Sequence, residues 1–182
     1  MLDKDIESVL ISQTDIQNIV SRLGREITRD YHDRFPIVLG LLKGCVPFMA
    51  ELLKVLDFHL EVAFMNVSSY HGGIESTGDV RIDMDLASPV KGRHVLLTED
   101  IIDTGRTIKA VSDLLLYRGA ASVKVVTLMD KPEGRIKDFV PDYIGRSIPK
   151  IFVVGFGLDY EERYRNLPYV GVLKEHVYTT KE

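Results

Sequence analysis

The sequence has no tryptophan and only one cysteine, Cys45. A single cysteine forms no disulfide within the chain and supplies no zinc cluster, so neither device can support this fold. We interpret Cys45 as a core residue rather than a nucleophile. No apolar run approaches the roughly 18 residues that cross a bilayer, and residues 1–10 lack the basic and apolar regions of an export signal. We therefore expect a cytoplasmic protein that does not enter a membrane.

The chain also has no excess of positive charge. It carries 27 acidic and 23 basic residues, for a net charge of −4, which argues against a nonspecific nucleic-acid-binding protein. Two nucleotide-binding signatures are missing as well. Residues 40–44, GLLKG, lack the glycine spacing and the Ser or Thr after lysine of a P-loop, and the glycine fingerprint of a dinucleotide fold does not occur.

What the sequence does contain is a globular composition arranged in alternating helix and strand patterns. Its 182 residues are 45% apolar and 27% charged, which fits one domain with its own core. The expected helices cover residues 12–33, 46–55 and 107–118. The expected strands cover residues 37–42, 60–68, 80–85, 95–98 and 122–129, with short strands at 143–146, 151–154 and 169–173. This alternation predicts a parallel α/β sheet whose ligands gather at the carboxyl ends of the strands, with the short strands in a small subdomain above that edge.

The stretch from Val95 to Thr107, VLLTEDIIDTGRT, carries the most distinctive chemistry of the chain. Four mostly apolar residues predict a buried strand that ends in two carboxylates, Glu99 and Asp100. This pair can hold a sugar diol or a metal ion through oxygen atoms. Residues 103–107, DTGRT, can wrap a turn and open a helix whose free N–H groups face an anion. A sugar phosphate could bind both halves of the stretch, with its hydroxyls at the acids and its phosphate at the turn.

These thirteen residues resemble the phosphoribosyl-diphosphate (PRPP) binding motif of type I phosphoribosyltransferases. The resemblance covers roughly residues 5–178 and implies the fold of that family, a central mainly parallel α/β sheet flanked by helices with a small hood subdomain of short strands. It implies a single domain over residues 1–182, with a core of roughly residues 30–140 and a hood from the N-terminal segment and roughly residues 141–182. It also implies that Glu99 and Asp100 bind the ribose hydroxyls directly or through Mg²⁺. The residues implied to hold the 5′-phosphate are Asp103, Thr104, Gly105, Arg106 and Thr107.

Asp103 is the residue that we expect to transfer a proton. The resemblance implies that it acts as the general base on N7 of a purine. A carboxylate held beside a bound phosphate gains affinity for a proton from the like charge, which suits it to that role. The same aspartate can also cap the helix that follows, and capping is compatible with catalysis.

Other segments resemble the remaining parts of the family's site. Lys43 and Gly44 resemble the pyrophosphate loop, in which family members often have a cis peptide before the lysine, and Arg165 matches an arginine that reaches pyrophosphate. Ser69 and Tyr70 begin a polar stretch with several glycines that resembles the mobile loop closing over the reaction. An ordinary surface loop is the alternative for that stretch.

Lys131 and residues 151–167, IFVVGFGLDYEERYRNL, resemble the hypoxanthine-guanine branch of the family. Phe152 is expected to stack on the purine, a contact worth about 0.5–1.5 kcal/mol beyond burial, and Val153 to present backbone groups to the base edge. The Lys131 ammonium can donate to the O6 carbonyl of hypoxanthine or guanine, whereas adenine presents an amine. A charge-assisted bond of roughly 1.5–3 kcal/mol implies about a ten- to hundredfold preference. Asp159 is expected to support a second Mg²⁺ or the guanine amine.

The resemblance thus predicts an Mg²⁺-dependent enzyme that transfers the phosphoribosyl group of PRPP to hypoxanthine or guanine. It also predicts a homodimer or homotetramer that binds neither nucleic acid nor a membrane. An alternative is a regulatory protein that binds RNA or DNA and only senses PRPP; such a regulator can dispense with Asp103 and Lys131 but needs a basic face or an added domain. A xanthine- or adenine-preferring enzyme differs only in the base pocket.

Overall fold

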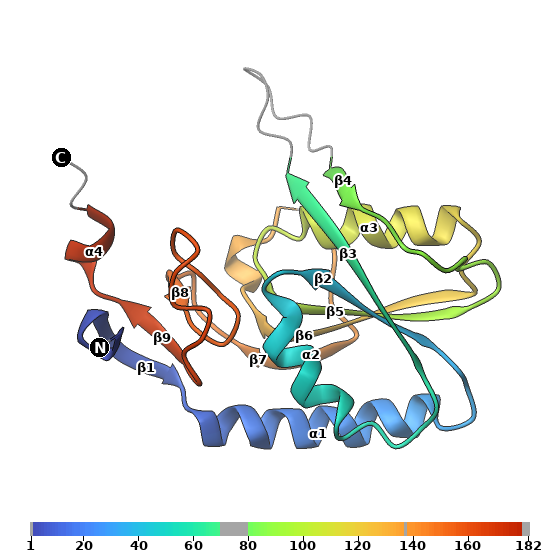
Figure 1. The fold of residues 1–182 in the computed structure, drawn as a ribbon, viewed down its shortest axis with the longest axis horizontal. Helices are drawn as coiled ribbons and strands as arrows, with labels where there is room; N and C mark the ends of the chain where they lie inside the picture. Colours follow the sequence, from blue (N-terminus) through green and yellow to red (C-terminus); the bar gives the residue numbers. More distant parts are fainter. Residues whose placement is uncertain (1, 70–79, 137, 180–182) are drawn as a thin grey trace.

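The computed structural model describes residues 2–69, 80–136 and 138–179 of the chain. Its centre is a six-stranded sheet in the order β4-β3-β2-β5-β6-β7, in which all neighbours are parallel except β3 and β4 (Figure 1). The strands are β2 (Ile37–Leu42), β3 (Glu61–Ser69), β4 (Val80–Met84), β5 (His94–Ile102), β6 (Ser122–Asp130) and β7 (Tyr143–Ser147). The predicted α/β architecture is confirmed, and β4 and β7 are the edge strands of this sheet.

Helices cover both faces of this sheet, as Figure 1 shows. They are α1 (Gln13–Tyr31), α2 (Cys45–Leu53) and α3 (Arg106–Tyr117). Side chains alternate along the strands, so that Ile37 and Leu39 of β2 join the core cluster of α3 while Val38 joins that of α1 and α2. The buried strands therefore read as continuous apolar runs, which is typical of a parallel sheet covered on both sides.

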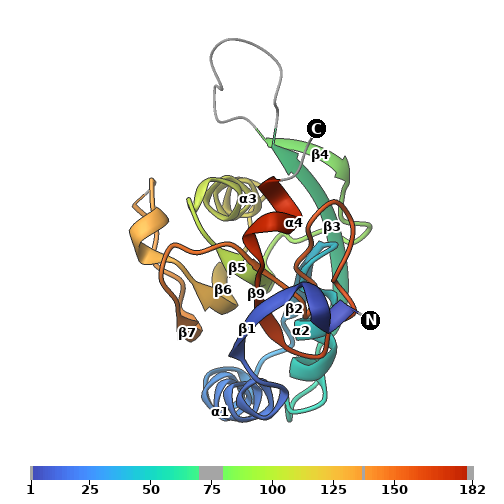
Figure 2. The same ribbon diagram turned by 90° about the vertical axis from the view of Figure 1, so that its left-hand side faces the viewer.

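A second, three-stranded antiparallel sheet forms the hood at one end of the molecule (Figures 1 and 2). Its order is β1-β9-β8, with β1 (Ile6–Ile11), β9 (Val170–Leu173) and β8 (Val153–Val154). It has its own small core of Ile6, Val154, Tyr164, Leu167 and Leu173. The short helices η1 (Leu2–Asp5) and α4 (Glu175–Thr179) lie at the same end of this sheet, where the Lys174 amide donates to the Asp5 carbonyl at 2.9 Å. The hood thus joins segments from both ends of the chain.

The structure differs from the sequence prediction at β7. Residues 143–146 were expected in the hood, but β7 pairs in parallel with β6 and completes the core sheet. Gly145 makes the close approach possible, because a methyl group there would lie 2.3 Å from the Leu128 carbonyl oxygen. From α1, Arg22 Nη2 donates to the carbonyls of Ile144 and Gly145 at 2.9 and 2.7 Å. The core therefore extends to about residue 147 rather than 140.

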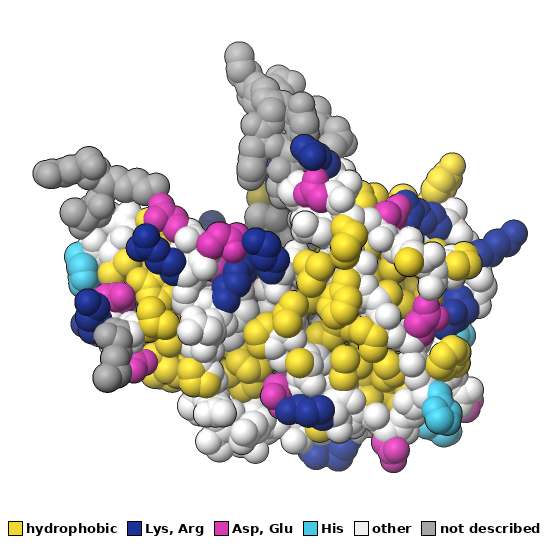
Figure 3. Space-filling view, viewed as in Figure 1, with side chains coloured by type: hydrophobic (Ala, Val, Ile, Leu, Met, Phe, Trp, Pro, Cys, Tyr) yellow, Lys and Arg dark blue, Asp and Glu magenta, His cyan; other side chains and the backbone are white. Residues whose placement is uncertain are grey.

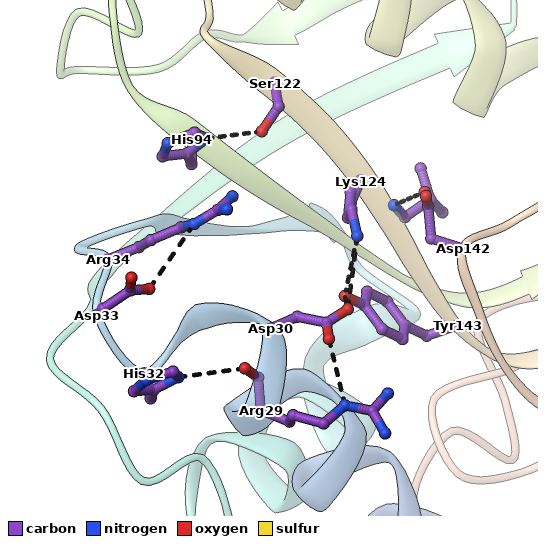
Figure 4. Close-up of polar contacts among 11 residues, drawn as sticks. Arg29, Asp30, His32, Asp33, Arg34, His94, Ser122, Lys124, Asp142 and Tyr143 are labelled. Carbon is purple, nitrogen blue, oxygen red and sulfur yellow. Dashed lines mark hydrogen bonds and ion pairs between the residues drawn. The ribbon is translucent and has the colours of Figure 1, made fainter.

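A polar cluster ties α1 to β6 and β7 at the amino ends of the strands (Figure 4). The Tyr143 hydroxyl donates to Asp30 Oδ2 at 2.6 Å, and Lys124 Nζ lies 3.5 Å from the same oxygen. The hydrogen bond from Tyr143 lowers the pKa of Asp30, while burial and the Asp30 carboxylate raise the pKa of Tyr143. This cluster secures the end of the sheet opposite the predicted site.

One face of the molecule carries an apolar surface. Figure 3 shows hydrophobic side chains gathered in its middle, over α2 and β3. Val46 of α2 is 45% exposed, and Val62 of β3 is 46% exposed. Phe64, two residues further along β3, is 37% exposed. We call Val46, Val62 and Phe64 the α2/β3 patch. Among the described residues, no helix is both long enough and apolar enough to cross a membrane.

Candidate active site

A cleft of about 300 Å³ opens at the carboxyl ends of β2 and β5. Its lining contains residues 99–107, which are most of the stretch that the sequence singled out. The other lining residues are Leu41, Leu42, Gly44, Val67 and Ile108. The two strands are neighbours in the sheet, so residues some sixty positions apart in the chain meet at one edge. This is the position that the fold provides for a ligand.

Glu99 and Asp100 lie side by side in this cleft, and β5 runs through them to Ile102 rather than ending before them as expected. Asp100 is buried, and its Oδ1 accepts from the Ile101 backbone amide at 2.7 Å. Its Oδ2 lies against Gly44, where a methyl group would come within 1.8 Å. Burial, followed by the neighbouring Asp100 charge, raises the pKa of Glu99 well above its ordinary value. Burial also raises the pKa of Asp100, and the Arg165 charge opposes that shift.

The turn after β5 ends at the amino end of α3. Gly105 is the N-cap of this helix at φ +76°, a left-handed conformation that glycine adopts without a steric cost. As a glycine, this N-cap has no side chain that could accept from the helix. The Thr104 hydroxyl accepts from the Arg106 amide at 3.4 Å. The first-turn N–H groups of α3 therefore open toward the cleft, where the partial positive charge of a helix amino end favours an anion.

Asp103 and Lys131, expected to act on the same base, lie close together. Asp103 Oδ2 is 3.7 Å from Lys131 Nζ. Lys131 is buried, whereas the Asp103 side chain is 45% exposed. The other carboxylate oxygen, Oδ1, rests against Gly134, where a methyl group would come within 2.0 Å. Asp103 is thus held at the cleft beside the buried ammonium.

Lys43 and Arg165 are linked by an acid that the sequence reasoning missed. Glu162 Oε2 lies 3.1 Å from Lys43 Nζ, and Glu162 Oε1 lies 3.3 Å from Arg165 Nη2. The same arginine nitrogen lies 2.8 Å from Asp159 Oδ1. The hydrogen bond from Lys43 lowers the pKa of Glu162. The Leu42–Lys43 peptide is cis, a state often found in the family that the sequence alone left open. Nothing in the run DYEERYR marks Glu162 as the bridging acid.

Phe152 and Val153 belong to the hood. Val153 is buried and pairs with Val172 of β9, whereas Phe152 is 47% exposed. The Phe152 ring lies 5.9 Å from the Tyr160 ring, edge to face, and 6.0 Å from that of Tyr178. The two tyrosines were not predicted, because they come from separate segments. Ser69 ends β3 and Tyr70 lies outside the described residues, so the predicted lid remains a prediction.

Comparison with known proteins identifies the family. A family model described as "Phosphoribosyl transferase domain" matches residues 12–161. The chain belongs to the phosphoribosyltransferase family. Among curated phosphoribosyltransferases, the hypoxanthine-guanine phosphoribosyltransferase of Lactococcus lactis is 59% identical over 97% of this chain and 96% of its own. The enzyme of that name from Streptococcus pneumoniae is 55% identical over 98% of this chain and 99% of its own.

Solved phosphoribosyltransferases have the same fold. A hypoxanthine phosphoribosyltransferase from Staphylococcus aureus aligns with a TM-score of 0.94 at 49% identity, covering 98% of this chain and 97% of its own. One from Trypanosoma cruzi, solved to define the role of its C-terminal region in oligomeric state and enzymatic activity, aligns with a TM-score of 0.92 at 34% identity, covering 96% and 95%. These matches confirm the predicted fold and the hypoxanthine-guanine branch. None of these relatives is named as a regulatory nucleic-acid-binding protein.

Proposed function

We propose that this phosphoribosyltransferase transfers the 5-phosphoribosyl group of PRPP to N9 of hypoxanthine or guanine. The products are IMP or GMP and pyrophosphate, a reaction of purine salvage. The observation that carries this proposal is the 3.7 Å approach of Asp103 to Lys131 at the turn that opens α3. It brings a proton acceptor and an O6 donor to one side of a phosphate site. The names of the relatives support the same activity.

In this proposal the turn before α3 binds the 5′-phosphate. The N–H groups of residues 104–107 and the hydroxyls of Thr104 and Thr107 donate to its oxygens. Gly105 allows the backbone to turn beneath the anion because of its left-handed conformation. Arg106 adds a cation at the same helix end. The binding energy of this remote group orients the ribose for the reaction.

Glu99 and Asp100 bind the ribose hydroxyls directly or through Mg²⁺. Carboxylate oxygens are the ligands that magnesium prefers, and it commonly takes one or two carboxylates together with substrate oxygens. The described residues contain no group of three or more acids, histidines and cysteines placed to hold a metal ion. Mg²⁺ held by Glu99 and Asp100 would supply positive charge to the departing pyrophosphate. Burial raises the pKa of each acid, and a bound cation would stabilise their ionised forms.

Lys43, Gly44 and Arg165 bind the pyrophosphate. The two cations already face carboxylates, Glu162 and Asp159, in the ligand-free protein. We assign Asp159 to a second Mg²⁺ or to the guanine amine. Ser69 and Tyr70 are assigned to the closing loop, which would exclude water from the oxocarbenium-like centre.

The purine is read by Lys131, Phe152 and Val153. The Lys131 ammonium donates to O6, Phe152 stacks on the ring, and the backbone of Val153 meets the base edge. Asp103 accepts the proton from N7 as positive charge develops on the ribose. The Lys131 ammonium favours a 6-oxopurine, because the exocyclic amine of adenine at position 6 would face a second hydrogen-bond donor.

We further propose that the protein is a cytoplasmic homodimer or homotetramer in which a second copy covers the α2/β3 patch. Apolar patches of this kind mark interaction surfaces. The Trypanosoma cruzi relative is described by the role of its C-terminal region in oligomeric state, and this supports testing whether the present chain assembles.

The decisive experiment is a set of ultraviolet assays with Mg-PRPP and hypoxanthine, guanine, xanthine, adenine or uracil. We expect turnover of hypoxanthine or guanine at least tenfold above that of adenine in kcat/KM, from the Lys131 bond. Faster turnover of adenine refutes the role of Lys131. Absence of turnover with every base favours a PRPP-sensing regulator instead.

A further inference from the structure

The segment from Asp130 to Ile136 runs along the phosphate turn and is fastened to it at successive residues. The Lys131 amide donates to the Ile102 carbonyl at 2.9 Å, and the Ile136 amide donates to the Thr104 carbonyl at 3.1 Å. Between these two bonds, the Asp103 carboxylate rests on Gly134. In Figure 1 the orange one-turn helix η2 (Pro132–Gly134) lies beside the amino end of α3. The part that carries Lys131 and the part that carries Asp103 therefore form one unit.

Arg135 occupies the centre of this unit. Its Nη2 forms a hydrogen-bonded ion pair with Asp130 Oδ1, and the two side chains are only 14% and 7% exposed. The other side of the guanidinium faces the turn. A methyl group on Gly105 would lie 3.0 Å from Arg135 Cδ and 3.2 Å from its Nη1. The arginine is thus packed directly against the N-cap of α3.

The remaining nitrogen of this guanidinium supports a role beyond packing. Arg135 Nη1 is buried and has no hydrogen-bond partner within the part of the chain that the structure describes. A buried donor without a partner is costly, and such groups are rare in folded proteins. An apolar side chain of similar length fills the same space at no such cost. Filling space therefore does not explain an arginine at this position. Its contact with the phosphate turn explains it better.

We propose that Arg135, anchored by Asp130, is a positioning residue that sets the distance between the phosphate turn and Lys131. The inference rests on the proposed function, because it concerns the distance between the site that binds the phosphate and the site that binds the base. Lysine cannot replace arginine here, since an ammonium lacks the planar group that bonds Asp130 through one nitrogen while another nitrogen packs against Gly105. Arg135 acts through its contacts with Asp130 and Gly105, without touching the reacting atoms.

The first test is Arg135→Lys, which keeps the charge beside Asp130. We expect a folded protein whose KM for PRPP rises about tenfold and whose kcat falls about tenfold, because a misplacement of about 1 Å can cost up to a hundredfold. Loss of folded enzyme alone lowers the apparent kcat and leaves KM unchanged. A KM for PRPP equal to that of the wild type therefore overturns the proposal.

The second test separates positioning from stability. Arg135→Met alone leaves Asp130 buried without a partner and can unfold the protein, whereas Asp130→Leu combined with Arg135→Met replaces both charges by apolar side chains. Replacing a buried pair in this way commonly preserves stability. We expect the double variant to melt near the wild type but to keep the raised KM for PRPP. Wild-type kinetics in a stable double variant show that the pair is only structural.

Arg118→Lys is the matched control. Arg118 bonds Asp85 through both nitrogens at 2.6 Å at the other end of α3, far from the cleft. We expect no change in either KM. If the wild type turns over no purine with Mg-PRPP, the proposed function fails together with this inference. If the wild type is active and Arg135→Lys matches it, only the inference fails.

Discussion

Asp103 is the single side chain whose chemistry is tested most directly. Asp103→Asn keeps the size of the group and its contact with Gly134 but removes the proton acceptor. We expect kcat to fall about 10²- to 10⁴-fold, the usual contribution of a general base. Thermal stability should hold, because the side chain is 45% exposed. Steady-state kinetics and a melting curve measure the two effects.

The control for this substitution is Asp113→Asn on the exposed surface of α3, where Asp113 pairs with Lys109. Like Asp103→Asn, this substitution removes one negative charge, but it does so on α3 rather than in the turn before it. It should leave kcat unchanged. An Asp103→Asn enzyme with wild-type kcat would remove Asp103 from the mechanism.

Glu99 and Asp100 lead to a prediction about pH. Burial raises the pKa of both carboxyls. The unfolded chain therefore ionises first as pH rises, so the folded protein loses stability above the ordinary carboxyl range. We expect Glu99→Gln to melt higher than the wild type near pH 7, by about 2–4 °C for each 1 kcal/mol gained, while its affinity for Mg-PRPP falls.

Melting curves of the ligand-free proteins between about pH 4 and pH 8 measure this effect. The advantage of Glu99→Gln should shrink toward the acid end, because there the wild-type carboxyl is already protonated. A difference in melting temperature that is independent of pH, or a lower melting temperature near pH 7, contradicts the assignment.

At the residue scale, the sequence was informative where partners are adjacent in the chain. Glu99, Asp100 and the turn through Thr107 form one continuous stretch, so their chemistry could be read directly, and the structure places them in one cleft. Glu162 and Arg135 were missed because their roles come from contacts with Lys43 and Gly105, which lie 119 and 30 positions away in the chain.

At the element scale, the alternating helices and strands were predicted because their patterns are long and periodic. The short β7 was misplaced, since five residues carry little periodicity and its partner was set by the close approach at Gly145. The end of β5 was also misjudged. Two acids that stop an apolar pattern do not stop a strand whose backbone pairs with β6 as far as Ile102.

The polar cluster of Asp30, Lys124 and Tyr143, which joins α1 to β6 and β7, gives a prediction at this scale. Tyr143→Phe removes the hydroxyl that donates to Asp30 at 2.6 Å. We expect a loss of about 1.5–3 kcal/mol, because the acceptor is charged. The pKa of Asp30 is lowered in the fold, so this stabilisation is present above the ordinary aspartate range and is lost as pH falls through the folded value. The cost of the substitution should therefore shrink in acid.

Urea unfolding near pH 7 and near pH 3 measures the Tyr143→Phe effect. Tyr117→Phe is the control, because Tyr117 is 90% exposed and should change nothing. This polar cluster lies at the end of the sheet opposite the cleft, so kcat should stay at the wild-type value. An equal cost at both pH values would mean that the hydroxyl acts through packing rather than through the Asp30 charge.

At the scale of the whole molecule, the hood could be expected only through the family resemblance. Its strands come from both ends of the chain, and β1 pairs with β9 across more than 150 residues. Contacts between side chains reinforce this closure: the Tyr164 hydroxyl donates to Asp5 at 3.0 Å and the Tyr169 hydroxyl to Asp3 at 2.5 Å. No local pattern predicts such pairing, because it depends on where the core brings the two ends.

The α2/β3 patch allows a test of assembly. Val62 and Phe64 stand on the same face of the sheet as α2, beyond the helix that would cover them. If a second copy buries this patch, Val62→Glu places an unpaired charge in the interface, which costs several kcal/mol. We expect the variant to sediment as a smaller species than the wild type at the same concentration. Its secondary structure should be unchanged, since Val62 is 46% exposed in the single chain.

Val9→Glu is the matched control for assembly. Val9 is a strand valine of the hood with 53% exposure, so the same substitution adds the same charge outside the α2/β3 patch. Light scattering on both variants distinguishes a local effect from the change in net charge. A wild-type chain that is monomeric at micromolar concentration, or a Val62→Glu variant with the mass of the wild type, contradicts burial of this patch by a second copy. A smaller mass for both variants would assign the effect to charge alone.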